Sequence, residues 1–406
     1  MTIIIVNDYD YIQGGASKVA IETANLLYSN NYNVIFFCSV SNRERSNLNK
    51  QIKVYSLNQT DCLSQKSLKG LFQGIYNRQA RKEFKKLLSS IDGDIIVHIH
   101  GWTKSLSSSF INAVKDHNRI KVVLTLHDFF SICPNGGLFN YKKNSVCHIK
   151  PLSTKCFLTN CDSRNYIIKL YRFVREFYQN KICKFRSRID LVITISSLQK
   201  KVLSPFFPGK ELIYVYNPTS IEKQPENRIY SEINNEYLYV GRLTEDKGID
   251  ILCEYFSHRK ETLNVVGKGY LSDKLIKKYF DFKNIKFHGW LSPEKTFTMM
   301  GNARALFVPS VYYEGAPLTV FEGLAQGLPV IVSEICSGAD FIDENCGIIF
   351  DPYNADEFDK IMNSLDDEII RGISIHSFNN YWNNPYDKNR YFLNLSRVYE
   401  DLLIEK

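Results

Sequence analysis

Short apolar runs alternate with amphipathic helical segments along almost the whole chain, and this pattern starts twice. In the first half the strand-like runs are Ile3–Val6, Val34–Cys38, Ile95–Ile99, Val122–Leu126 and Leu191–Ile195. In the second half they are Tyr237–Val240, Leu263–Val266, Ile285–Phe287, Ala305–Val308 and Val330–Ser333. Strands separated by helical segments predict βαβ units, whose parallel strands are covered by helices on both faces. The sequence therefore predicts an α/β protein of two consecutive, doubly wound, parallel-sheet domains.

The expected domain boundary lies near residue 220. The chain has 406 residues, which suits two domains of about 200 residues each. Asn217–Ser220 and the polar residues up to Asn235 are typical of a linker. We expect a first domain at 1–220, a second at 221–385, and a helix within 386–406. That last segment either caps the second domain or crosses back to the first.

Composition and charge restrict the class of protein and its partners. Apolar residues make up 44% of the chain and charged residues 23%, and no apolar run reaches the roughly 18–20 residues of a membrane-spanning helix. The chain opens directly on a strand-like run without a leader pattern, so we expect a cytoplasmic protein. Residues 1–220 carry 31 Lys and Arg against 14 Asp and Glu, a net +17, whereas residues 221–406 carry 20 against 29, a net −9.

The basic first half favours an anionic partner, although docking of the acidic half against it is the simpler alternative. Basic residues alternate with aromatic and aliphatic ones along Arg164–Arg188, and a second basic stretch runs over Arg78–Lys86. Such segments suit an anionic membrane surface, unless their apolar stripe is a core face. No nucleic-acid reader motif accompanies the charge, so we expect no nucleic-acid partner.

Three segments that follow strands suit a phosphorylated ligand. Gly14 and Gly15 precede the first helix, where free N–H groups favour an anion. Arg242 and Lys247 follow the strand Tyr237–Val240 between glycines, where cations can hold a diphosphate and stabilise its leaving charge. Glu314 and Glu322 flank a helix start at Pro317, which we expect as the first helical residue. Two such carboxylates can accept hydrogen bonds from vicinal hydroxyls of a sugar and a ribose.

Metal-dependent chemistry is the less favoured interpretation. Asp8 and Asp10, like Asp92 and Asp94, form Asp-x-Asp pairs of the kind that bind a divalent ion, but we expect them to be loop and turn residues. Ten cysteines occur, and Cys133, Cys147, Cys156 and Cys161 stand close together beside His148. Their spacing lacks the paired Cys-x2-Cys of common zinc sites. A structural zinc or a redox cluster stays open, but free thiols are the favoured interpretation in a reducing cytoplasm.

Together these motifs resemble glycosyltransferase family 4, retaining enzymes of the GT-B fold. The matching features occur in the family's order: Gly14–Ala16, His127–Asp128, Gly241–Gly248, Gly267–Gly269, His288–Trp290, and the Glu-x7-Glu element of Glu314 and Glu322. They span residues 14 to 322. The chain departs from common family patterns at Ala316, where an aromatic is frequent, and at Gly323, where alanine is usual.

The resemblance implies two Rossmann-like domains that face a cleft, with a nucleotide-sugar donor bound between them and no metal or cofactor. By that analogy Arg242 and Lys247 bind the diphosphate, Glu322 binds the ribose, and Trp290 lies near the base. Glu314 and the segment Gly315, Ala316, Pro317 and Leu318 hold the sugar, Gly15 lies near the diphosphate, and His127 lies by the sugar and the acceptor.

The expected function is transfer of a sugar, with retention of configuration, to a glycan acceptor. We expect that acceptor to be lipid-linked, at the inner face of the membrane, in the assembly of a bacterial surface polysaccharide. The alternatives are a GT-B-fold sugar-nucleotide epimerase or phosphorylase and, outside enzymes, a sugar-nucleotide-binding adaptor. His98 and His100 flank a strand without comparable context, and we assign them a structural role.

Overall fold

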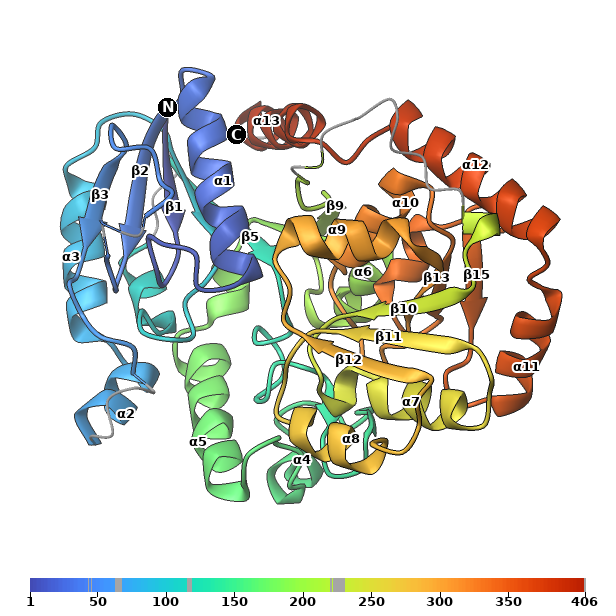
Figure 1. The fold of residues 1–406 in the computed structure, drawn as a ribbon. Helices are drawn as coiled ribbons and strands as arrows, with labels where there is room; N and C mark the ends of the chain where they lie inside the picture. The colour runs from blue at the N-terminus through green and yellow to red at the C-terminus, as the bar shows by residue number, and fades with distance from the viewer. Residues whose placement is uncertain are drawn as a thin grey trace.

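A computed structural model describes residues 1–42, 44, 46–62, 68–114, 119–219, 221 and 231–404. Within them the chain forms two lobes (Figure 1), each built on a parallel β-sheet. The expected boundary and linker fall partly outside these residues, because 220 and 222–230 are among those not described.

The first sheet has the order β3-β2-β1-β4-β5-β8-β9 in the described residues, and all its pairings are parallel. Its strands are β1 (Thr2–Val6), β2 (Asn33–Cys38), β3 (Lys53–Ser56), β4 (Ile95–Ile99), β5 (Ile120–Leu126), β8 (Leu191–Thr194) and β9 (Glu211–Tyr214). The central strands β1, β4 and β5 are apolar and almost wholly buried, as expected for strands covered on both faces. The edge strands β3 and β9 were not predicted, because they are short and only partly buried.

Helices and short turns cover this sheet. They are α1 (Gly15–Ser29), α2 (Leu68–Ile75), α3 (Arg78–Ser89), α4 (Thr154–Leu158), α5 (Tyr166–Phe177) and α6 (Ser197–Leu203), with the short helices η2 (Ser108–Ala113), η3 (Tyr178–Ile182), η4 (Phe185–Arg188) and η5 (Ser204–Phe206). A small hairpin of β6 (Phe139–Asn140) and β7 (Ser145–Val146) follows β5.

The second sheet has the order β12-β11-β10-β13-β14-β15, again all parallel in the described residues. Its strands are β10 (Glu236–Val240), β11 (Thr262–Val266), β12 (Ile285–Gly289), β13 (Ala303–Val308), β14 (Val330–Ser333) and β15 (Gly347–Phe350). The strand order reverses between β10 and β13. At such a switch point, the carboxyl ends of parallel strands open a crevice for a ligand.

The helices of the second lobe complete the doubly wound arrangement. They are α7 (Ile249–Ser257), α8 (Ser272–Lys278), α9 (Pro293–Gly301), α10 (Leu318–Gln326), α11 (Ala355–Ser364) and α12 (Asp367–Asn383), with the short helices η6 (Ser231–Ile233), η7 (Glu245–Lys247) and η8 (Ser337–Phe341). The expectation that Pro317 is the first helical residue was wrong. Its ψ of 112° is extended, so it is the N-cap and α10 begins at Leu318.

The last helix, α13 (Lys388–Ile404), crosses back to the first lobe and lies beside α1 (Figure 1). Tyr391, Leu395 and Tyr399 are buried in one apolar cluster with β1 and α1. The chain passes between the lobes near Thr219 and again near Tyr386. These two segments contact each other, because the Thr219 N–H donates to the Tyr386 carbonyl (2.8 Å). Two segments of the chain, one at Thr219 and one at Tyr386, therefore connect the lobes. The C-terminal helix α13 is part of the hydrophobic core of the first lobe.

Candidate nucleotide-sugar site

A pocket of about 390 Å³ opens at the carboxyl ends of β10, β11 and β12. Three of the predicted residues line it: Arg242 follows β10, Trp290 follows β12, and Glu322 lies on α10. The Trp290 side chain is 68% exposed, so its ring is open to a stacking partner. Because Glu322 is largely enclosed, burial raises the pKa of its carboxyl group, an effect that Lys18 of the first lobe opposes.

Two close backbone approaches lie at this edge of the sheet. Gly267 has a φ of +139°, and a Cβ on it would lie 1.8 Å from the Gly241 carbonyl oxygen. Gly248 has a φ of +67°, and a Cβ there would lie 1.9 Å from the Pro309 carbonyl oxygen. Only glycine avoids both the strained backbone and the clash. Because they carry no Cβ, these glycines let the segments that follow β10, β11 and β13 lie close together.

Lys247 and Glu314 form an ion pair beside this pocket. Both side chains are largely buried, with 13% and 12% exposed. Ser310 Oγ donates to Glu314 Oε2 (2.7 Å), and the Lys247 ammonium lies 5.3 Å from the centre of the Tyr312 ring. Burial alone would lower the pKa of Lys247, but the Glu314 carboxylate outweighs it and holds that pKa above its usual value.

The same pair keeps Glu314 ionised. Burial alone would raise the pKa of Glu314, but the Lys247 charge, together with hydrogen bonds from Lys247 and Ser310, lowers it below its usual value. Arg242 is also near enough to contribute to this lowering. Its own contact with Asp246 is long (3.8 Å), and 67% of its side chain is exposed, so the guanidinium remains available to a ligand.

The loop Gly315–Pro317 lies where the lobes meet. A Cβ on Gly315 would come 2.9 Å from Ile195 Cδ1 and 3.5 Å from the His127 carbonyl oxygen, so the backbone of His127, in the first lobe, lies against this loop. Ser337 Oγ donates to the Gly315 carbonyl oxygen (2.5 Å). Gly323 packs against the sheet, since a Cβ there would lie 3.1 Å from Val330 Cγ2. A side chain at this position would therefore require Val330 and Leu306 to shift by a few tenths of an ångström.

The predicted residues thus fall into three neighbouring groups. Arg242, Trp290 and Glu322 line the pocket, Lys247 and Glu314 form the buried pair, and His127 meets the Gly315 loop. Gly15 begins α1, and the space around its Cβ position is open. Leu318 begins α10 and is 39% exposed.

Several residues of the site were not assigned from the sequence. Lys268 lines the pocket at the end of β11, and its place between Gly267 and Gly269 repeats the pattern of Arg242 after Gly241. Ser310 and Tyr312 support the ion pair, but only the folded chain shows this. His100 contacts His127, with His100 Nδ1 and His127 Nε2 3.0 Å apart. The sequence signal that could have indicated a site role for His100 is its position directly after β4.

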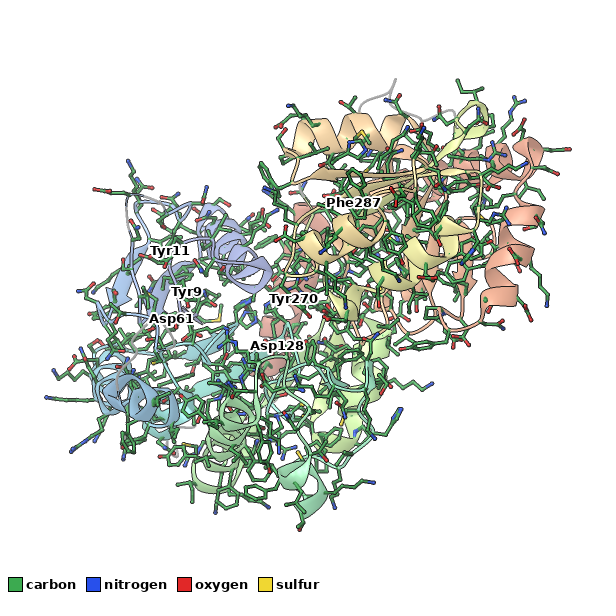
Figure 2. The ribbon with its side chains drawn as sticks, turned by 60° about the horizontal axis from the view of Figure 1, so that its bottom comes forward. Tyr9, Tyr11, Asp61, Asp128, Tyr270 and Phe287 are labelled. Atoms are coloured by element: carbon green, nitrogen blue, oxygen red, sulfur yellow. The ribbon has the colours of Figure 1, made fainter. Side chains whose placement is uncertain are left out.

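Aromatic and acidic side chains gather in the first lobe after β1. Tyr9 and Tyr11 have ring centres 5.4 Å apart, and the Tyr9 hydroxyl donates to Asp61. Figure 2 labels these three residues and Asp128 on the first lobe, whereas Tyr270 belongs to the second. Burial raises the pKa of Asp128 to about 6. Carboxylates can accept hydrogen bonds from sugar hydroxyls, and aromatic rings can stack on the faces of sugar rings.

The Asp-x-Asp pair after β1 is used structurally. Asp8 accepts hydrogen bonds from the N–H groups of Lys104, Ser105 and Leu106 (2.8–2.9 Å), and Asp10 from Ser41 and Asn42. The structure describes all ten cysteines, and none of them forms a disulfide. In the described part of the chain, Cys133, Cys147, Cys156 and Cys161 do not form a group of ligand atoms close enough for one metal ion.

Comparison with known proteins points to glycosyltransferases. Residues 220–371 match the family described as Glycosyl transferases group 1. An uncharacterized glycosyltransferase of Haemophilus influenzae is 23% identical over 379 residues, covering 87% of this chain and 86% of the relative. The lipopolysaccharide glucosyltransferase WaaG of Escherichia coli is 27% identical over 287 residues, covering 65% and 72%. HepE of Anabaena in complex with UDP-glucose has a TM-score of 0.63 at 15% identity, covering 99% of this chain and all of that structure. The resemblance inferred from the motifs is confirmed: residues 220–371 match the group 1 glycosyltransferase family, and the chain has the GT-B fold.

Proposed function

We propose that this enzyme transfers a sugar from a nucleotide-sugar donor to a glycan acceptor with retention of anomeric configuration. One observation supports this most: a pocket lined by Arg242, Trp290 and Glu322 adjoins the buried Lys247–Glu314 pair at the strand-order switch. The pocket offers an aromatic face for a base, a carboxylate for ribose hydroxyls and a cation for phosphate. A relative of the same fold was crystallised with UDP-glucose, which makes that the first donor to test.

The charges of the site support departure of the nucleotide diphosphate without a metal ion or cofactor. Lys247 has N–H donors beyond the one held by Glu314, and Arg242 can add a bidentate contact. Fixed cations aimed at the leaving phosphate stabilise the charge that develops there. Glu314 keeps Lys247 charged and in place, and its remaining acceptor capacity suits a hydroxyl of the sugar. We expect transfer to persist in excess EDTA.

Donor binding is expected to depend on Glu322. A nucleotide sugar that binds the folded protein raises its melting temperature by mass action. Glu322→Gln removes a charged hydrogen-bond acceptor of a type worth about 1.5–3 kcal/mol, so donor affinity should fall by about 10- to 150-fold. Asp273→Asn, an exposed carboxylate of α8, should leave affinity unchanged. A thermal-shift panel of nucleotide sugars followed by titration calorimetry measures both; equal affinities for the two variants would contradict the assignment.

The reaction itself separates transfer from its alternatives. Incubation of one donor with and without a glycan acceptor, followed by NMR of the anomeric proton, is expected to show product only with acceptor and with the donor's configuration. Turnover of the donor alone would indicate an epimerase, and cleavage by phosphate a phosphorylase. Inversion of the anomeric centre would contradict the retaining assignment.

We further propose that the acceptor is lipid-linked and that the first lobe docks on the inner face of the cytoplasmic membrane, in surface-polysaccharide assembly. No helix in the described residues has the length and apolarity to cross a bilayer. In helix α5, however, charged side chains are buried and apolar ones are exposed. Lys169, Arg175 and Glu176 are the buried charged residues. Its apolar Ile167, by contrast, is 77% exposed, and Val174 and Phe177 are about half exposed.

Basic residues occur near the C-terminal end of α5. The Tyr178 ring, just after α5, lies 5.7 Å from the Tyr76 ring, between α2 and α3, so the end of α5 lies near the start of α3. Exposed cations occur in α3 and in the residues after α5: Arg78, Arg81, Lys82, Lys85, Lys181 and Lys184. Apolar side chains that enter the lipid boundary beside cations that meet anionic headgroups are the usual elements of peripheral membrane binding. Relatives such as WaaG act on lipopolysaccharide, which agrees with an acceptor held at a membrane.

Removal of the exposed apolar residues is expected to release the protein from anionic vesicles. Each buried side chain of this size contributes about 1.5–3 kcal/mol, so Ile167→Glu with Phe177→Glu should weaken binding to phosphatidylglycerol vesicles by at least about tenfold. Ile369→Glu changes an isoleucine of α12 that is 44% exposed and serves as the control. Sedimentation with vesicles measures both. Undiminished binding of the double variant would exclude this face as the docking surface.

A further inference from the structure

Three histidines form a continuous row in the first lobe. His98 on β4 packs against His100, with ring centres 4.2 Å apart, and His100 Nδ1 lies 3.0 Å from His127 Nε2. His98 is fixed at both nitrogens, because Nδ1 contacts the Tyr399 hydroxyl (2.6 Å) and Nε2 contacts Thr125 Oγ1 (2.7 Å). The row thus runs from the C-terminal helix to the His127 side of the Gly315 loop.

The contact between His100 and His127 requires one proton between two nitrogens. Burial lowers the pKa of His127 to about 4 and that of His100 well below its usual value, with neighbouring imidazoles adding to the second effect. Both rings are therefore neutral at pH 7. A neutral imidazole carries one donor and one acceptor nitrogen, so either His100 Nδ1–H donates or His127 Nε2–H does.

The far nitrogen of His100 decides between these two arrangements. His100 is 3% exposed, and its Nε2 is enclosed without a hydrogen-bond partner in the described chain. If His127 donated, the proton of His100 would have to sit on that Nε2, as a buried donor without an acceptor. Orphaned buried N–H groups are rare because their desolvation is not compensated. The opposite arrangement leaves only a lone pair unused.

We propose that His100 is a positioning residue whose Nδ1–H donates to His127 Nε2 and holds His127 as the Nδ1–H tautomer. The remaining edge of His127 is then a hydrogen-bond donor. Its Nδ1 has no partner in the described residues, and it is not among the enclosed partnerless atoms. That donor is available to a hydroxyl of the donor sugar beside the Gly315 loop. The inference rests on the proposed function for its substrate, although the tautomer itself does not depend on it.

Histidine-selective ¹⁵N labelling of the full chain, without substrate, tests the tautomer directly. Long-range ¹H–¹⁵N correlation spectra distinguish a protonated Nδ1 from a protonated Nε2, and a His127→Asn spectrum assigns the signal among the eight histidines. The expected result is a neutral His127 protonated at Nδ1. A His127 protonated at Nε2 in the wild-type protein would overturn the proposal, whatever the activity.

Two substitutions of His100 test the positioning role. In His100→Asn the side-chain N–H₂ can replace the Nδ1–H donor, so the His127 tautomer and kcat/KM should stay within about threefold of wild type. In His100→Leu the donor is lost, so we expect a mixture of His127 tautomers. We expect kcat/KM to fall by at least about tenfold relative to wild type. Equal kinetics for the two variants would overturn the positioning role. Absence of transfer in the wild-type protein would instead refute the proposed function, and the wild-type spectrum would still decide the tautomer.

Discussion

Replacing Lys247 with alanine is expected to abolish sugar transfer and to destabilise the fold. The Glu314 carboxylate would then remain in a largely buried position without its cation. Breaking one partner of a buried ion pair typically costs about 3–5 kcal/mol of unfolding free energy. The loss of a charge aimed at the leaving group typically lowers kcat by about 10²- to 10³-fold. Urea unfolding and a donor-transfer assay measure the two effects.

A compensated variant separates the chemistry from the fold. Lys247→Met combined with Glu314→Gln removes both charges and keeps similar volumes, a change that is often neutral or stabilising for buried pairs. We expect stability near wild type and transfer still lost. Lys86→Met breaks a surface pair with Glu83 in which the lysine is 62% exposed, and it should change unfolding by less than about 1 kcal/mol. A compensated variant that transfers sugar at the wild-type rate would show that the pair is structural only.

Tyr399→Ala is expected to lower the unfolding free energy of the first lobe by about 3–5 kcal/mol, the usual range for deleting a buried aromatic side chain. Tyr399 lies on the helix that crosses back from the second lobe, and it is fully buried against β1 and α1. The deletion also leaves His98 Nδ1 without the hydroxyl that it contacts. The enlarged cavity and the unpaired nitrogen act in the same direction.

Two variants of the same helix serve as comparisons for Tyr399→Ala. Tyr399→Phe keeps the ring and removes only the hydroxyl, so we expect a loss of about 1–3 kcal/mol from the unpaired nitrogen. Leu393→Ala changes a residue of α13 that is 53% exposed, and it should be nearly neutral. Urea unfolding followed by circular dichroism gives all three values. If Tyr399→Ala were as stable as Leu393→Ala, α13 would not belong to the first core.

Most of the architecture was predictable because buried parallel strands are nearly pure apolar runs. Each predicted run coincides with a strand of one of the two sheets, and the reason is the burial of both faces of strands such as β4 and β13. The edge strands β3 and β9 escaped prediction, because a half-exposed strand of four residues has no distinct pattern. The lobe against which α13 packs was not predicted, because periodicity indicates a helix but does not indicate the surface that the helix contacts.

The candidate site was predictable to the extent that its residues follow strands. Arg242, Glu314 and Trp290 stand at carboxyl ends of strands, where parallel sheets place their ligands. The pairing of Lys247 with Glu314 joins residues far apart in the sequence, and only the fold shows it. The row from Tyr399 to His127 was missed for the same reason, because its members come from β4, β5 and α13. The reversed burial of α5 likewise depends on what surrounds the helix.

A crystal structure of the enzyme with UDP-glucose tests the central claim most directly. We expect the base against Trp290, the ribose hydroxyls within hydrogen-bond distance of Glu322, and the diphosphate on Arg242 and Lys247. A nucleotide bound away from the carboxyl ends of β10, β11 and β12, with those four side chains unoccupied, would contradict the account.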